Sequence, residues 1–135
     1  MKTAVWDTYV KKKDGMVLHF DILVPENLND SEIIFQYGEE YLKSIGENSS
    51  EITSEQCQLC HVEVPGEEVI RAISEKGYYI LEMDEIPASL PDNPSRRDKI
   101  LYLRAHFPEY RFANFRGVPD DEIENLLYTI SKGTN

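Results

Sequence analysis

The sequence is poor in the residues that cross-link small proteins or coordinate metals. It has 2 cysteines and 3 histidines in 135 residues, whereas a structural zinc site usually needs four good ligands. A chain of this length can bury a hydrophobic core without disulfides or metal. No apolar run approaches the length of a membrane-spanning helix, and the N-terminus lacks the apolar stretch of a signal peptide. We therefore expect a cytoplasmic protein with no membrane partner.

Positive charge is also scarce. The chain carries 14 Lys or Arg against 25 Asp or Glu, for a net charge of −11, which repels phosphate backbones and disfavours a nucleic-acid partner. The sequence also lacks a Gly-rich phosphate loop, a Ser-centred nucleophile elbow and a His-Glu-x-x-His motif. Because these motifs are missing, we assign no catalytic residue. With 41% apolar and 29% charged residues, the sequence is typical of a folded, soluble protein.

The acidity is uneven along the chain, and this predicts the domain organisation. Residues 1–83 have a net charge of −9, whereas residues 84–135 have a net charge of −2. Three prolines lie between residues 87 and 94, where they disfavour both helix and central strand. We therefore predict a main domain at 1–83, a Pro-rich connector at 84–94 and a helical appendage at 95–135.

Hydrophobic periodicity predicts a β-β-α-β-α-β order in the main domain. Strands at 3–10 and 16–24 form a hairpin around Gly15, and a helix over about 31–45 contains Gly38, which would permit close packing on the sheet. A polar loop at 47–50 and a capping-box pattern at 53–56, which predicts a short helix over 56–60, come next. A strand at 61–64, a helix ending at Gly77 and a strand at 78–83 follow. This pattern indicates an α+β fold, with a small, mainly antiparallel sheet and helices on one face.

The appendage is predicted to be a helical hairpin. Ser95 caps a helix that runs to about His106, and a second helix follows Pro119 with apolar side chains along one face. These apolar sides must pack on each other, on the main domain or on another chain. Residues 104–116 interleave aromatic and arginine side chains, a composition that favours a protein partner or self-association over nucleic acid.

Several separate motifs resemble one protein family. They are residues 4–10 (AVWDTYV), Asp14 with Gly15, residues 19–21 (HFD), the TSExCxxCH pattern of residues 53–61, and residues 77–79 (GYY). Together they are similar to a small bacterial family of uncharacterised proteins, known only as a domain of unknown function, over roughly residues 1–83. The resemblance implies a compact α+β domain in the bacterial cytoplasm and no established activity. Shorter members end near the connector, so the resemblance implies nothing about residues 84–135.

The first candidate site is the Cys-x-x-Cys-His (CxxCH) motif of residues 57–61. At the end of a helix, Cys57 and Cys60 would present both sulfurs on one side, where they could bind zinc or form a redox disulfide. His61 would add a third ligand, and His19 or a carboxylate a fourth. The motif also matches c-type haem attachment, but that chemistry requires export. A thioredoxin-type role is disfavoured because the motif does not lie in a βαβ unit. The alternative is a reduced pair of buried, small residues in a cytosolic protein.

The second candidate site is the polar face of the hairpin. Because side chains alternate along a strand, this face gathers a histidine, a phenol and two carboxylates, namely Asp7, Tyr9, His19 and Asp21. These groups are suited to general acid–base or metal-ligand chemistry, and the set forms a candidate ligand or partner face. The alternative is the ordinary solvent-exposed face of a half-buried sheet.

These observations favour a non-enzymatic binding or protein-interaction module. Its expected contact surfaces are the polar hairpin face and the appendage at 95–135, through which the chain would bind a protein partner or itself. The alternative is a metal (zinc) or thiol-redox protein that uses Cys57, Cys60 and His61, together with His19. No other cofactor is expected.

Overall fold

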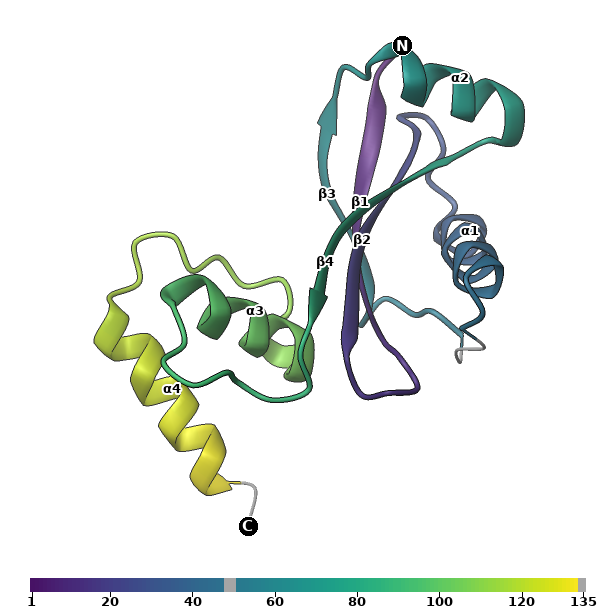
Figure 1. The fold of residues 1–135 in the computed structure, drawn as a ribbon. Coiled ribbons are helices and arrows are strands. Elements are labelled where there is room, and N and C mark those ends of the chain that lie inside the picture. The colour runs from purple at the N-terminus through teal and green to yellow at the C-terminus, as the bar shows by residue number, and fades with distance from the viewer. Residues whose placement is uncertain (48–50, 134–135) are drawn as a thin grey trace.

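The computed structural model describes residues 1–47 and 51–133 (Figure 1). Within them a 4-stranded antiparallel sheet has the strand order β3-β1-β2-β4. The strands are β1 (Thr3–Lys11), β2 (Val17–Pro25), β3 (Cys57–Glu63) and β4 (Tyr79–Ile86). The helices are α1 (Ser31–Ser44), α2 (Glu67–Lys76), α3 (Arg96–His106), a 3₁₀ turn at Pro108–Tyr110, and α4 (Asp120–Gly133). The predicted α+β class is confirmed. The predicted loop at 47–50, beyond Glu47, and the last two residues of the appendage lie outside the described residues.

The hairpin of β1 and β2 forms the centre of the sheet. Its connection is closed by a hydrogen bond of 2.7 Å from the Lys12 backbone N–H to the Met16 carbonyl. Gly15 has a φ of 90°, in the left-handed region that glycine adopts without steric cost. The predicted hairpin and its glycine turn are therefore confirmed.

Helix α1 covers the first face of the sheet. The Asp30 side chain caps it by accepting a backbone hydrogen bond from the first turn. The buried side of the helix consists of Ile34, Gly38 and Leu42. A Cβ atom at Gly38 would lie 2.7 Å from the Cδ1 of Ile52 and 3.0 Å from the Cδ1 of Ile22 on β2, so glycine allows the close approach of helix and sheet that the sequence predicted.

The segment before β3 corrects the helix predicted over residues 56–60. The Gln56 side chain does accept a hydrogen bond of 2.8 Å from the Thr53 backbone N–H, as the capping pattern requires. Only a single turn forms, however, and the chain is extended from Cys57 because its backbone pairs with β1. The predicted helix is wrong because tertiary strand pairing overrides a local propensity. The strand predicted at 61–64 begins at Cys57 for the same reason.

Strand β4 extends beyond its predicted end at residue 83. Asp84 pairs with His19 and Ile86 pairs with Val17 across the β2–β4 ladder. Ile86 is 3% exposed and packs in a small second core with Val17 and Tyr9. The sheet therefore continues into the segment predicted as a connector.

The appendage forms the predicted helical hairpin. α3 begins with a capping box between Ser95 and Asp98, and α3 and α4 pack around Leu103, Phe115 and Ile123. Figure 1 shows this hairpin beside the sheet, on the side away from α1. Its residues Ala105, Leu101 and Phe112 pack against the second core, so the apolar side of α3 contacts its own sheet. None of the described helices is both long and apolar enough to cross a bilayer.

Arg111 ties the appendage to the main domain. Its side chain is buried, and the guanidinium donates hydrogen bonds to the backbone carbonyls of Arg104 (3.0 Å), Ala105 (2.8 Å) and Glu55 (3.1 Å). Glu55 precedes β3, so this one side chain links both parts of the chain. Buried donors that are satisfied in this way stabilise a single arrangement of the elements.

Candidate functional site

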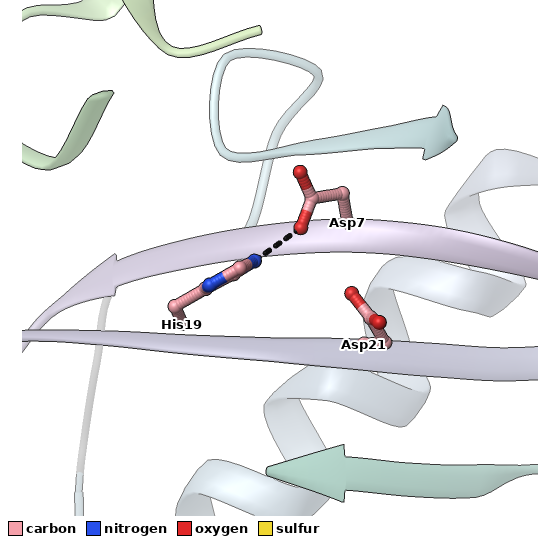
Figure 2. Close-up of side chains that lie close together, drawn as sticks. All are labelled: Asp7, His19 and Asp21. Atoms are coloured by element: carbon pink, nitrogen blue, oxygen red, sulfur yellow. Dashed lines mark hydrogen bonds and ion pairs between the residues drawn. The ribbon is translucent and has the colours of Figure 1, made fainter. Parts of the chain in front are cut away.

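The second face of the hairpin carries a cluster of polar side chains. Asp7 is directly opposite Asp21 in the β1–β2 register, and Tyr9 is directly opposite His19. Because side chains alternate, all four lie on the face that α1 does not cover. Figure 2 shows the carboxylates of Asp7 and Asp21 and the imidazole of His19 gathered across the two strands. We call Asp7, His19 and Asp21 the acid–histidine cluster.

The imidazole of His19 is held at both of its nitrogens. Nε2 contacts the carboxylate of Asp7, and Nδ1 lies 3.3 Å from a carboxylate oxygen of Asp84 on β4. Arg97, in the first turn of α3, donates a hydrogen bond of 2.9 Å to the other oxygen of Asp84. The ring also stacks on Tyr9, with ring centroids 4.2 Å apart. These contacts fix the orientation of the ring and leave 11% of the His19 side chain exposed.

The electrostatic surroundings of the cluster perturb two of its groups. Burial disfavours the charged form of His19, but the contacts with Asp7 and Asp84 outweigh burial, so the pKa of His19 is raised. Burial and the facing carboxylate of Asp7 raise the pKa of Asp21 from 3.8 to about 6. Two carboxylates that face each other across strands repel unless a proton or a cation lies between them. The arrangement therefore favours a protonated imidazole at His19, a proton on Asp21 or a bound cation.

The appendage covers part of this face and leaves a cleft beside Asp7. Phe112 packs edge-on against Tyr9 with ring centroids 6.2 Å apart, and Tyr9 is 1% exposed. A cleft of about 390 Å³ lies between β1, β3 and the loop that follows α3, and its lining includes Asp7, Cys60 and Arg104. The acid–histidine cluster is therefore accessible from solvent at Asp7.

The structure separates the residues of the Cys-x-x-Cys-His motif. Cys57 is buried in the core beneath α1, where the Thr8 hydroxyl donates to its sulfur at 3.2 Å. Cys60 lies at an irregularity in the β3 register, is exposed, and lines the cleft on the opposite face. His61 pairs with Glu63 at 2.7 Å. The helical turn that would gather the two sulfurs is not formed, so the structure does not bring Cys57, Cys60, His61 and His19 together.

The surroundings of both cysteines favour the protonated thiol. Burial raises the pKa of Cys57 to about 12. Burial, together with the charges of Asp7 and Asp21, raises the pKa of Cys60. Because the thiolate is the nucleophile, these positions disfavour thiol chemistry. The position of Cys57 fits the alternative of a small buried core residue.

The motifs on the four strands lie in a part of the chain that matches a family model. The model described as "Domain of unknown function (DUF2024)" matches residues 1–83. The chain belongs to this family. A solved structure with a similar fold is the NMR structure of protein NE1680 from Nitrosomonas europaea, Northeast Structural Genomics Consortium target NeT5. It has 44% sequence identity and a TM-score of 0.55, and the match covers 62% of this chain and 96% of that chain. No curated protein matches the chain.

Three residues beside the cluster of this DUF2024 domain were not predicted from the sequence. Asp84 follows a register shift in the β2–β4 ladder, so simple alternation along β4 would have placed it on the face of α1. Arg97 and Arg104 belong to α3. Arg97 contacts Asp84 and Arg104 lines the cleft beside Asp7 only because the appendage packs on this face. No sequence pattern indicates which face of the sheet α3 covers.

Proposed function

We propose that the protein is a non-enzymatic binding module that holds one divalent transition-metal ion at the acid–histidine cluster. The observation that carries this proposal is that Asp7, His19 and Asp21 each offer a ligand atom, and that these atoms lie within 4.8 Å of one another. Such spacing allows one ion to contact all three side chains. The ligands come from neighbouring strands of a hairpin, and side chains on regular elements are held more precisely than side chains on loops.

The second line of support is the set of groups behind His19. A metal-bound histidine usually directs its other ring nitrogen at a carboxylate, which orients the ring and increases its basicity. Asp84 lies 3.3 Å from Nδ1 of His19, which leaves Nε2 as the nitrogen that faces Asp7. Arg97 holds Asp84 from the solvent side. This arrangement supports the proposal, in which the ion would take the place of the proton between Nε2 and Asp7.

The donor atoms indicate which ions suit the site. One imidazole nitrogen and two carboxylate groups match Zn²⁺, Co²⁺, Mn²⁺ or Fe²⁺, and thiolate-preferring ions such as Cu⁺ suit them poorly. A cation would also neutralise the facing carboxylates of Asp7 and Asp21. His19 also belongs to the ligand set predicted from the Cys-x-x-Cys-His motif, but the proposed site uses no sulfur ligand.

The groups that border the site support binding rather than catalysis. Tyr9 is almost completely buried, and burial together with Asp7 raises its pKa. The thiol of Cys60 is kept in its protonated form, as described above. Burial keeps the Tyr9 phenol protonated despite the neighbouring Arg104, and a protonated phenol or thiol is a weak nucleophile at neutral pH.

Metal titration of the purified full chain tests the proposal. We expect native mass spectrometry to show one Zn²⁺ or Co²⁺ per chain. Asp21→Asn should weaken the affinity by about 100-fold or more, because it removes one of three protein ligands. The Co²⁺ complex should lack the thiolate charge-transfer absorption that cysteine ligation produces.

The matched control is a second histidine–carboxylate pair on the same sheet. His61 and Glu63 on β3 are also paired, but their side chains are about half exposed, and they lie outside the acid–histidine cluster. His61→Ala should leave metal affinity unchanged. If His61→Ala or Cys60→Ser abolishes binding while Asp21→Asn does not, the proposal is wrong and the cysteine motif is the metal site.

A further inference from the structure

The appendage concentrates positive charge in an otherwise acidic protein. Residues 95–116 contain six Arg or Lys and two Asp or Glu, whereas the whole chain has a net charge of −11. Four arginines of this segment line one cleft of about 390 Å³ between α3 and the loop that precedes α4: Arg96, Arg97, Arg104 and Arg116. We call it the arginine cleft. Ile100 and Phe115 contribute apolar surface to its wall.

Two of the arginines are held in place by the appendage itself. Arg96 donates a hydrogen bond of 3.0 Å to the Phe115 carbonyl and also pairs with Asp120. Arg104 donates a hydrogen bond of 3.2 Å to the Ala113 carbonyl and lies over the Phe115 ring. These contacts position both guanidinium groups and do not use all of their five N–H donors.

The other two arginines are more available. Arg97 has 71% of its side chain exposed and uses one nitrogen on Asp84. The backbone N–H of Arg116 donates to the Asn114 side chain at 2.9 Å, and within the described residues the structure shows no hydrogen bond or ion pair for the Arg116 guanidinium. The described residues that line the cleft include no carboxylate. In this part of the chain only Arg96 and Arg97 of the four arginines form ion pairs, so positive charge and hydrogen-bond donors remain unsatisfied.

We propose that the arginine cleft binds a small molecule that carries a phosphate group. A phosphate has three terminal oxygens and close to two negative charges, so it can accept hydrogen bonds from several guanidinium groups at once, often in bidentate pairs. The volume of the cleft is within the range of small-molecule sites. The apolar surface of Ile100 and Phe115 would contact the non-phosphate part of the ligand. This inference does not require a metal ion, although Arg97 also contacts Asp84 and Arg104 also lines the cleft beside Asp7.

Phenyl phosphate is a suitable probe because it combines the anion with an apolar ring. We would titrate it into the ¹⁵N-labelled, metal-depleted full chain and follow the backbone amides and the arginine side-chain resonances. The expected result is a saturable shift confined to residues 96–116, with no shift when phenol replaces phenyl phosphate. Metal depletion ensures that the phosphate is not bound through an ion at the acid–histidine cluster.

Two variants and a matched control distinguish a site from general charge attraction. Arg116→Ala should weaken phenyl phosphate binding about tenfold, because it removes a charge-assisted contact without breaking a contact within the protein. Arg97→Ala should weaken it similarly. Arg71 is an exposed arginine on α2 outside the cleft, and Arg71→Ala should have no effect. The proposal is overturned if shifts spread over the whole surface, or if Arg71→Ala and Arg116→Ala weaken binding equally.

Discussion

Replacement of Asp21 by asparagine should stabilise the metal-free protein at neutral pH. Asp21 faces Asp7 across the hairpin, and burial with this neighbour raises its pKa from 3.8 to about 6. A carboxyl group whose pKa is raised on folding binds more protons in the native state, so stability falls as the pH rises through that range. Above pH 6 the full shift corresponds to about 3 kcal/mol. Because Asp21 is only partly buried, screening by solvent should reduce this cost to about 1–2 kcal/mol.

Urea unfolding in the presence of a chelator, followed by far-UV circular dichroism, measures this effect. We expect Asp21→Asn to be more stable than the wild type by about 1–2 kcal/mol at pH 7.5, and by about half as much at pH 5.0. His19 acts in the same direction in the wild type. Its raised pKa contributes stability that is present below the unfolded pKa and is lost as the pH rises through the folded value. The stability of Asp21→Asn should therefore still fall as the pH rises, but less steeply than the stability of the wild type.

Asp92→Asn is the matched control, because Asp92 is exposed in the connector. It should change stability by less than about 0.5 kcal/mol at either pH. A loss of stability in Asp21→Asn at pH 7.5 would refute the reasoning. It would mean that the ionised carboxylate makes net favourable contacts in the fold and that the facing carboxylates do not oppose each other.

Three further substitutions, one of them with a matched control, test the packing. Leu42→Ala should cost about 2–5 kcal/mol in urea unfolding, because Leu42 is 0% exposed on the buried side of α1. Ile33→Ala on the exposed side of the same helix should cost less than about 1 kcal/mol, and equal losses would contradict the assigned buried face. Gly77→Ala should lower stability by about 1–2 kcal/mol in thermal unfolding. Gly77 has a φ of 94°, and the added Cβ would lie 2.8 Å from the Tyr37 hydroxyl. An unchanged melting temperature would argue against this strain. Arg111→Met should lower the free energy of unfolding by about 2–4 kcal/mol, because it removes three hydrogen bonds to backbone carbonyls. It should also make the appendage more sensitive to limited proteolysis. Protease resistance equal to that of the wild type would show that Arg111 does not join the two parts.

Much of the fold could be predicted from periodicity alone. Alternation along β1 and β2 correctly placed Asp7, His19 and Asp21 on one face, because strand side chains have a strict period of two. The Ser95 cap of α3 was predicted correctly because capping residues act locally. The family resemblance, drawn from short motifs, was also confirmed.

Non-local contacts explain what the sequence did not reveal. The pattern around Gln56 predicted a helix, yet β1 draws the following residues into the sheet. A register shift turns Asp84 toward His19, and short local windows do not encode such shifts. The arginines near the site depend on where a second unit packs, and hydrophobic patterning predicts that α3 has an apolar side but not which surface covers it.

The way in which the appendage is joined to the sheet has a consequence for exchange with solvent. α3 and α4 have their own core around Leu103 and Ile123, so they can stay folded when their contact with the sheet breaks. That contact consists mainly of the small second core and Arg111. Regions with few buried contacts open at a lower free energy than the whole protein unfolds. Hydrogen exchange should therefore detect a rare open species in which the hairpin moves away from the sheet as a unit. In this species the proposed metal site would be open to solvent while the sheet remains intact.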